Sequence, residues 1–130
     1  MLADYRGLIR MSAEQLPYNL LDRRVENESL PACGRAGVAV FAWSPLAMGM
    51  LAGRYDNDDP QSFESARYQR GGIYAERITP RAVKAGQSYA ALAAKFSLSP
   101  AQLALLWVKD QPGITAPLVG PRTRAHLETA

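Results

Sequence analysis

Residues 38–43 (VAVFAW) form an uninterrupted apolar run, and this run restricts the possible folds more than any other feature. Gly37 precedes it, and Ser44 and Pro45 follow it, so signals for a chain turn bound it on both sides. A short apolar run without polar alternation is typical of a strand that is covered on both faces, as strands of parallel sheets are. Residues 114–119 (ITAPLV) form a second run that is mostly apolar. The sequence therefore predicts two buried parallel strands.

Helical signals alternate with these strands. Thr79 and Ser99 are each followed by proline, the arrangement of an N-cap residue with proline at the first helical position. Gln102 completes a capping box with Ser99, and Gly37 stands where a helix C-cap glycine belongs. The expected helices are residues 25–36, 79–96, 99–110 and 124 to the end, and residues 15–21 are expected to be extended. This alternation predicts an α/β fold with a parallel sheet.

Two further segments have the composition of loops. Residues 44–53 (SPLAMGMLAG) are small and contain glycines, which predicts a loop that opens into a short helical turn. Residues 54–78 are rich in Asp, Asn, Gly and Arg, and a loop of this length is usually functional or mobile. The sequence leaves open whether this long loop closes over a ligand.

Composition narrows the function classes. Of the 130 residues, 48% are hydrophobic and 21% are charged, which excludes an intrinsically disordered chain. The single cysteine, Cys33, excludes an internal disulfide, and the sequence contains no apolar stretch long enough to predict a membrane span. The net charge of +3 is spread along the chain, so nucleic acid is not an expected partner. We expect a cytoplasmic protein. A complete (β/α)₈ barrel is excluded, because that fold typically needs roughly 250 residues.

Four blocks in order along the chain resemble the aldo-keto reductases. They are residues 15–23 (QLPYNLLDR), 43–55 (WSPLAMGMLAGRY), 99–107 (SPAQLALLW) and 118–122 (LVGPR). The resemblance is greatest to the bacterial and potassium-channel-beta-like branch, and it covers about residues 15–130, while residues 1–14 stay unplaced. It implies the C-terminal portion of a (β/α)₈ TIM barrel, about strands six to eight with their helices.

The resemblance also implies a chemistry. The family transfers hydride from NADPH to an aldehyde or ketone, so residues 15–130 would be a partial NADP-dependent oxidoreductase domain. The family's catalytic Asp, Tyr, Lys and His belong to the first half of the barrel, so no catalytic residue is expected in this chain. We expect the chain alone to be inactive, with a small carbonyl substrate bound only by the complete barrel.

Residues that match the family's cofactor-binding blocks are expected to bind NADP. Trp43 would stack on the nicotinamide ring, and Gln15 would hydrogen-bond its carboxamide. The backbone of the 44–53 loop would approach the pyrophosphate, and Arg122 would bind the 2′-phosphate that distinguishes NADP from NAD. The full expected set is Gln15, Trp43, Ser44, Pro45, Leu46, Gly49, Leu51, Gly53, Gly120, Arg122, Thr123 and His126.

Several of these residues have a simpler structural interpretation when taken alone. Trp43 would then be a core aromatic, and Thr123 a helix N-cap. His126 stands where the family usually has Gln, and it is the only histidine, so the sequence predicts no metal site.

A second hypothesis is a non-catalytic nucleotide-binding or interaction module that pairs with a separate N-terminal half. For the first hypothesis, a C-terminal fragment of the barrel, the exposed edges of parallel strands predict marginal stability or association.

Overall fold

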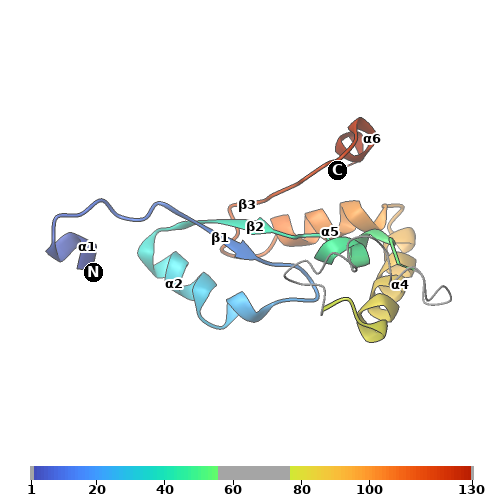
Figure 1. Ribbon diagram of the computed structural model, residues 1–130, viewed down its shortest axis with the longest axis horizontal. Helices are drawn as coiled ribbons and strands as arrows, with labels where there is room; N and C mark the ends of the chain where they lie inside the picture. Colours follow the sequence, from blue (N-terminus) through green and yellow to red (C-terminus); the bar gives the residue numbers. More distant parts are fainter. Residues whose placement is uncertain (1, 56–76, 130) are drawn as a thin grey trace.

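The computed structural model describes residues 2–55 and 77–129, which are built around three parallel strands (Figure 1). β1 (Ala13–Pro17) and β3 (Ala116–Pro117) lie on either side of β2 (Ala39–Trp43), and both pair with it in parallel. β2 falls within the apolar run at residues 38–43. The predicted α/β fold with a parallel sheet is confirmed.

The register of the sheet separates a buried face from a half-open face. Val40 and Ala42 of β2 are 0% exposed. They pack in one cluster with residues of α2 (Ser29–Ala36) and α5 (Pro100–Lys109). Neighbouring β2 residues point to the other face, where Phe41 lies beside Gln15 of β1 and stays only half-buried. The prediction that this strand is covered on both faces is therefore correct for one face only, because the helices of this cluster pack on the Val40 side.

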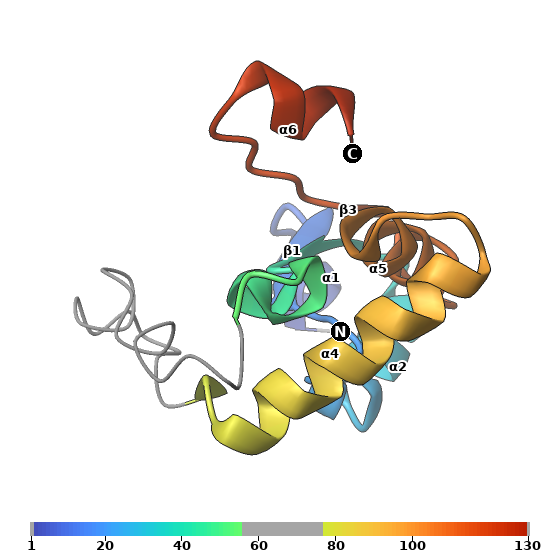
Figure 2. The ribbon, with the colours of Figure 1, turned by 90° about the vertical axis from the view of Figure 1, so that its right-hand side faces the viewer.

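A second cluster forms where η2 (Ala47–Ala52) packs against α4 (Pro80–Lys95), as Figure 2 shows. Leu51 of η2 and Val83 of α4 are each 1% exposed in this cluster. Gly86 makes the close approach possible, because a Cβ at this position would lie 2.4 Å from the carbonyl oxygen of Met50. The segment that follows β2 is thus held directly against α4.

The predicted caps fix the ends of the main helices. The Oγ1 of Thr79 accepts from the backbone N–H of Ala82 at the start of α4. Ser99 and Gln102 form the reciprocal capping box of α5, with N–O distances of 3.2 and 3.0 Å. Gly37 ends α2 in the left-handed conformation, with φ +67°. These helix boundaries are confirmed to within a residue or two.

The expected helix at residues 25–36 is wrong in its first part. The chain forms a 3₁₀ turn, η1 (Arg24–Glu26), and then α2 begins separately at Ser29. Pro31 explains the break, because it lacks the N–H that a continuous helix would need there, whereas the first turn of α2 tolerates it.

The expected strand at residues 114–119 is also shorter and less buried than predicted. Only Ala116–Pro117 pair as β3, and Leu118 and Val119 are 37% and 48% exposed. Within the described ranges β3 pairs with β2 alone, so its other edge and its apolar side chains lack the cover that a central strand would have.

The two ends of the described chain lie away from the sheet (Figure 1). α1 (Leu2–Tyr5) begins within residues 1–14, and the last two of those residues belong to β1. α6 (Arg124–Glu128) stands apart from the other helices, at the end of the extended segment that follows β3 (Figure 2). Most of the long loop at 54–78 lies outside the described residues. Whether this loop closes over a ligand therefore stays an open prediction.

No single helix in residues 2–55 or 77–129 has the length and apolarity to cross a membrane. α4 and α5 pass that test only as a pair, and they are bent by 89° at the break between them.

Candidate cofactor site at the carboxyl ends of the strands

The loops that follow β2 and β3 leave the same edge of the sheet, because the two strands are parallel. The β2 loop continues from Trp43 through residues 44–46 into η2, and the β3 loop runs from Leu118 to Thr123, where α6 is capped. In barrels of parallel strands, the carboxyl edge carries the reactive groups, and loops after late strands commonly bind phosphate. The two loops predicted to bind the cofactor therefore emerge at the same edge of the sheet.

The β2 loop has an unusual backbone. Ser44, Ala47 and Met48 have φ values of +56°, +47° and +60°, and Gly49 has φ +100°. Left-handed backbone in residues with a Cβ costs of order 1 kcal/mol each, and such residues concentrate at functional sites. At Gly49 a Cβ would also lie 2.9 Å from Cδ of Arg54. The backbone of this loop is thus bent tightly against the Arg54 side chain.

A cavity of about 680 Å³ lies between the two loops. Its volume is within the range of about 300–1,000 Å³ that is usual for small-molecule sites. Ser44 and Gly49 line it from the β2 loop, and Leu118 lines it from the β3 loop. Arg54, Arg122 and His126 add nitrogen donors from three positions around it.

Seven of the twelve expected cofactor residues line this cavity. They are Ser44, Pro45, Leu46, Gly49, Gly120, Arg122 and His126.

The other five lie elsewhere. Leu51 is 1% exposed and packs in the core against α4, and Gly53 is the left-handed cap of η2. Thr123 is the N-cap of α6, and its Oγ1 accepts from the backbone N–H of His126 at 3.2 Å. Gln15 and Trp43 project from one face of the sheet, because the register pairs Gln15 with Phe41 and Pro17 with Trp43.

Trp43 lines a second, smaller cavity of about 270 Å³, and Ser44 and Met48 line both cavities. Asn19 and Arg77 also line this cavity, although neither was predicted as a site residue. The indole thus lies beside the loop that forms the larger cavity.

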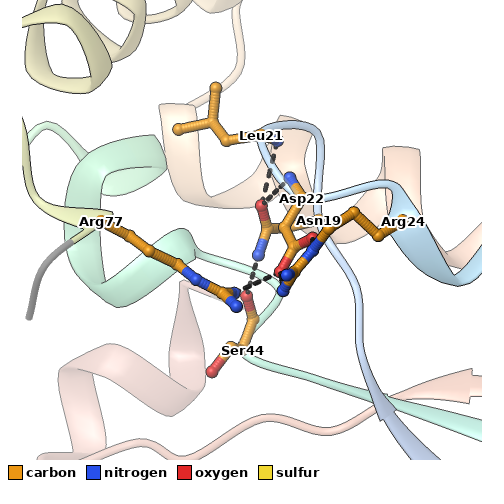
Figure 3. Close-up of polar contacts among 6 residues, drawn as sticks. All are labelled: Asn19, Leu21, Asp22, Arg24, Ser44 and Arg77. Atoms are coloured by element: carbon orange, nitrogen blue, oxygen red, sulfur yellow. Dashed lines mark hydrogen bonds and ion pairs between the residues drawn. The ribbon is translucent and has the colours of Figure 1, made fainter. Parts of the chain in front are cut away.

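A group of polar residues lies beside Ser44 (Figure 3). The side-chain Nδ2 of Asn19 donates to the carbonyl oxygen of Ser44 at 3.0 Å. Its Oδ1 accepts from the backbone N–H groups of Leu21 and Asp22, at 3.0 and 2.9 Å. Asn19 is only 5% exposed, so these three bonds compensate for the burial of its amide.

Asp22 is the charged member of this group. Its carboxylate accepts from Arg24 at 2.8 Å and also forms an ion pair with Arg77. Burial pushes the pKa of the Asp22 carboxyl upward, but the Arg24 hydrogen bond and the charges of Arg77 and Arg24 together outweigh it, so the pKa is lowered. Asp22 therefore stays ionised and ties the β1 loop to the residues that precede α4.

Asn19, Arg54 and Arg77 line the two cavities but were not predicted from the sequence as site residues. Arg54 belongs to the 43–55 block that carries the family resemblance, but its basic side chain was not singled out. Asn19 lies in the 15–23 block, and only its burial in the folded chain distinguishes it from an ordinary turn residue.

The residues present fit a nucleotide cofactor. Guanidinium groups bind phosphate bidentately, and the cavity places Arg54 and Arg122 around one space. Among the described residues, no cluster of three or more His, Cys, Asp or Glu suits a metal ion. The two guanidinium groups favour an anionic ligand.

The chain is similar to several known proteins over nearly its whole length. The chain is 35% identical to the uncharacterized oxidoreductase YrpG of Bacillus subtilis over 125 residues, which cover 96% of this chain and 36% of that protein. It is 35% identical to the protein Tas of Escherichia coli over 129 residues, covering 98% and 36%. A probable voltage-gated potassium channel subunit beta of rice, Oryza sativa, is 28% identical and is covered to 37% of its length.

Among solved structures, the glycerol dehydrogenase of Gluconobacter oxydans superposes with a TM-score of 0.70 at 24% identity. The match covers 98% of this chain and 38% of that enzyme, so the two share a fold over this region. The chain thus spans a little over a third of the length of each of these relatives. The sequence model of the aldo/keto reductase family matches residues 1–130 in full, and the chain belongs to that family, as its four sequence blocks predicted.

Proposed function

We propose that the chain is the C-terminal portion of an NADP-dependent aldo-keto reductase barrel, about strands six to eight, and that it supplies part of the cofactor site. The observation that carries the proposal is the cavity of about 680 Å³ between the β2 and β3 loops, which is lined by Arg54, Arg122 and His126. The three parallel strands and the match to about a third of each relative's length support the assignment to one part of the barrel.

In this proposal the chain binds and orients the cofactor. Backbone groups of the 44–49 turn contact the pyrophosphate, and Arg122 binds the 2′-phosphate. Trp43 stacks on the nicotinamide, and Gln15, on the same face of the sheet, hydrogen-bonds its carboxamide. A bound reduced nicotinamide supplies a hydride to a carbonyl group, and the proton donor for that step belongs to the first half of the family's barrel. We therefore expect binding of NADPH without carbonyl reduction by this chain.

A titration with NADPH and NADH, followed by tryptophan fluorescence, tests the proposal. We expect NADPH to bind more tightly than NADH. We expect Arg122→Ala to weaken NADPH binding about tenfold or more and to leave NADH binding nearly unchanged, because a hydrogen bond between charged groups contributes about 1.5–3 kcal/mol.

Arg35→Ala serves as the control, because it also removes one positive charge but lies on α2, outside the residues that line the cavity. Equal affinity of the wild type for both nucleotides would contradict the assignment of Arg122. Reduction of an aldehyde by the purified chain would contradict the expected absence of a catalytic residue.

A second candidate function is a non-catalytic module that pairs with a separate N-terminal half. It is favoured by β1 and β3, each of which, within the described ranges, pairs with β2 alone. NADPH binding that becomes tighter when a family N-terminal half is added would support this function.

A further inference from the structure

The bonds between β1 and β2 continue one step beyond the backbone ladder. The last backbone bond there runs from the N–H of Tyr18 to the carbonyl oxygen of Trp43, at 3.1 Å. At the next residue pair, the side-chain amide of Asn19 donates to the carbonyl of Ser44 at 3.0 Å. Ser44 has already turned into the left-handed region, with φ +56°. A side chain thus makes the connection at the point where the strand geometry ends.

The orientation of the Asn19 amide is set by its other bonds (Figure 3). Its Oδ1 faces two backbone donors, the N–H groups of Leu21 and Asp22, so its NH₂ group must face the Ser44 carbonyl. A carboxylate at this position could accept the same two bonds but could not donate to Ser44. The donor function of Asn19 can therefore be separated experimentally from its role in its own turn.

The Ser44 carbonyl is also the start of the cofactor loop. It accepts a second bond, from the N–H of Ala47 at 3.0 Å, which closes the turn before Met48 and Gly49. Ala47 and Met48 are held in left-handed backbone, a conformation that persists only where its surroundings impose it. Asn19 is well placed to impose it, because it fixes the carbonyl on which this turn closes.

We propose that Asn19 is a positioning residue whose side-chain amide, by fixing the Ser44 carbonyl, holds the 44–49 loop in the shape that receives the cofactor. This inference rests on the proposed function of that loop. Asp22 supports the arrangement, because its backbone pairs with that of Asn19 and its carboxylate pairs with Arg77. The role proposed here depends on the bond from Asn19 to Ser44, although Asn19 also lines the smaller cavity beside Trp43.

Two substitutions isolate the donor. Asn19→Asp keeps the size and the acceptor oxygen but removes the N–H groups and places a negative charge near the Ser44 carbonyl. Asn19→Ser is neutral, keeps a short acceptor for the turn, and cannot reach Ser44. It therefore carries the test if the buried charge of the first variant prevents folding. Asn27→Asp is the matched control, since it makes the same change on the exposed residue that follows the neighbouring 3₁₀ turn η1.

The first readout needs no cofactor. We expect amide hydrogen exchange at Ala47 to be at least about tenfold faster in both Asn19 variants, with exchange in α5 unchanged, and we expect wild-type exchange in Asn27→Asp. Equal acceleration throughout the chain would indicate general destabilisation and would overturn the proposal. Unchanged exchange at Ala47 would also overturn it.

The second readout is the dissociation constant for NADPH, which we expect to rise about tenfold in both Asn19 variants and to stay unchanged in Asn27→Asp. Faster loop exchange with wild-type affinity would overturn the link between Asn19 and cofactor binding. Failure of the wild type to bind NADPH would instead contradict the proposed function, and the exchange at Ala47 would still decide whether Asn19 holds the loop.

Discussion

The carboxylate of Glu26 accepts hydrogen bonds from two side chains of the segment after β1, Tyr18 and Arg23. It accepts a hydrogen bond from the hydroxyl of Tyr18 at 2.6 Å and two from the guanidinium of Arg23, at 2.7 and 3.0 Å. That guanidinium also lies 5.5 Å from the centre of the Trp107 ring on α5. The hydrogen bond from Arg23, followed by that from Tyr18, holds the pKa of the Glu26 carboxyl below its ordinary value of 4.5.

This lowered pKa predicts a loss of stability in acid. The unfolded chain takes up a proton at Glu26 near pH 4.5, whereas the folded chain does so only at lower pH. Between these values the unfolded state binds more protons, so the free energy of unfolding falls as the pH is lowered. The pKa of Asp22 is also lowered from its ordinary value of 3.8, so Asp22 adds to the loss of stability as the pH falls below 3.8. We expect urea unfolding to show full stability above about pH 5, declining steadily below it.

Glu26→Gln should flatten this acid decline and lower the stability near neutral pH. Glu128→Gln is the control, because Glu128 pairs only with Arg124 among the residues described, on the exposed surface of α6. An acid decline as steep in Glu26→Gln as in the wild type would show that the Glu26 contacts do not stabilise the fold.

At the scale of elements, the position of the cofactor loop depends on how closely α4 approaches η2. A Cβ at position 86, which any residue other than glycine has, would lie only 2.4 Å from the carbonyl oxygen of Met50 in η2. Gly86→Ala must separate the two elements, and overpacking of this kind costs about 1–3 kcal/mol. We expect a lower free energy of unfolding in urea, despite the better helix propensity of alanine.

Gly34 provides the matched control, since it lies in α2 with nothing within 4 Å of the position of an added Cβ. Gly34→Ala should stabilise the chain by about 0.5–1 kcal/mol through helix propensity alone. If Gly86→Ala stabilised the chain to the same extent, the close contact between α4 and η2 would not be important.

The elements differ in how far the sequence predicts them, and the difference is physical. The starts of α4 and α5 depend on Thr79, Ser99 and the prolines after them, so a few neighbouring residues determine them. The break before α2 was equally local, and Pro31 would have indicated it. The length of β3 could not be predicted in this way. The length of a strand depends on its partner strands, and the sequence of residues 114–119 does not show which strands pair with them.

The same distinction applies to the candidate site. Six of the seven expected residues that line one cavity belong to the 43–55 and 118–122 blocks, because these blocks contain the loops after β2 and β3 and parallel strands bring such loops to one edge. The seventh, His126, follows in α6. The contribution of Asn19 could not be predicted, because it depends on a bond from the loop after β1 to a carbonyl that is 25 positions further along the chain.

At the scale of the whole molecule, the described sheet leaves strand edges unpaired and part of its apolar surface uncovered. Within the described ranges β1 and β3 are both edge strands, and the half-open face of β2 includes Phe41 and Trp43. Apolar side chains are also exposed just before β1, where Ile9 is 99% exposed and Met11 is 64% exposed. Unpaired edges beside exposed apolar residues favour pairing with another chain.

We therefore expect the purified chain to associate with itself through the β1 edge. Sedimentation velocity should show an average mass that rises with concentration across the micromolar to millimolar range. The double variant Ile9→Lys with Met11→Lys should shift this rise to higher concentration, because charged residues at a sheet edge oppose pairing. The control is Phe96→Lys with Leu127→Lys, which changes two side chains that are 62% and 59% exposed but lie off the sheet. A monomer at every concentration, or an equal effect of both double variants, would show that the β1 edge is not the surface through which the chain associates.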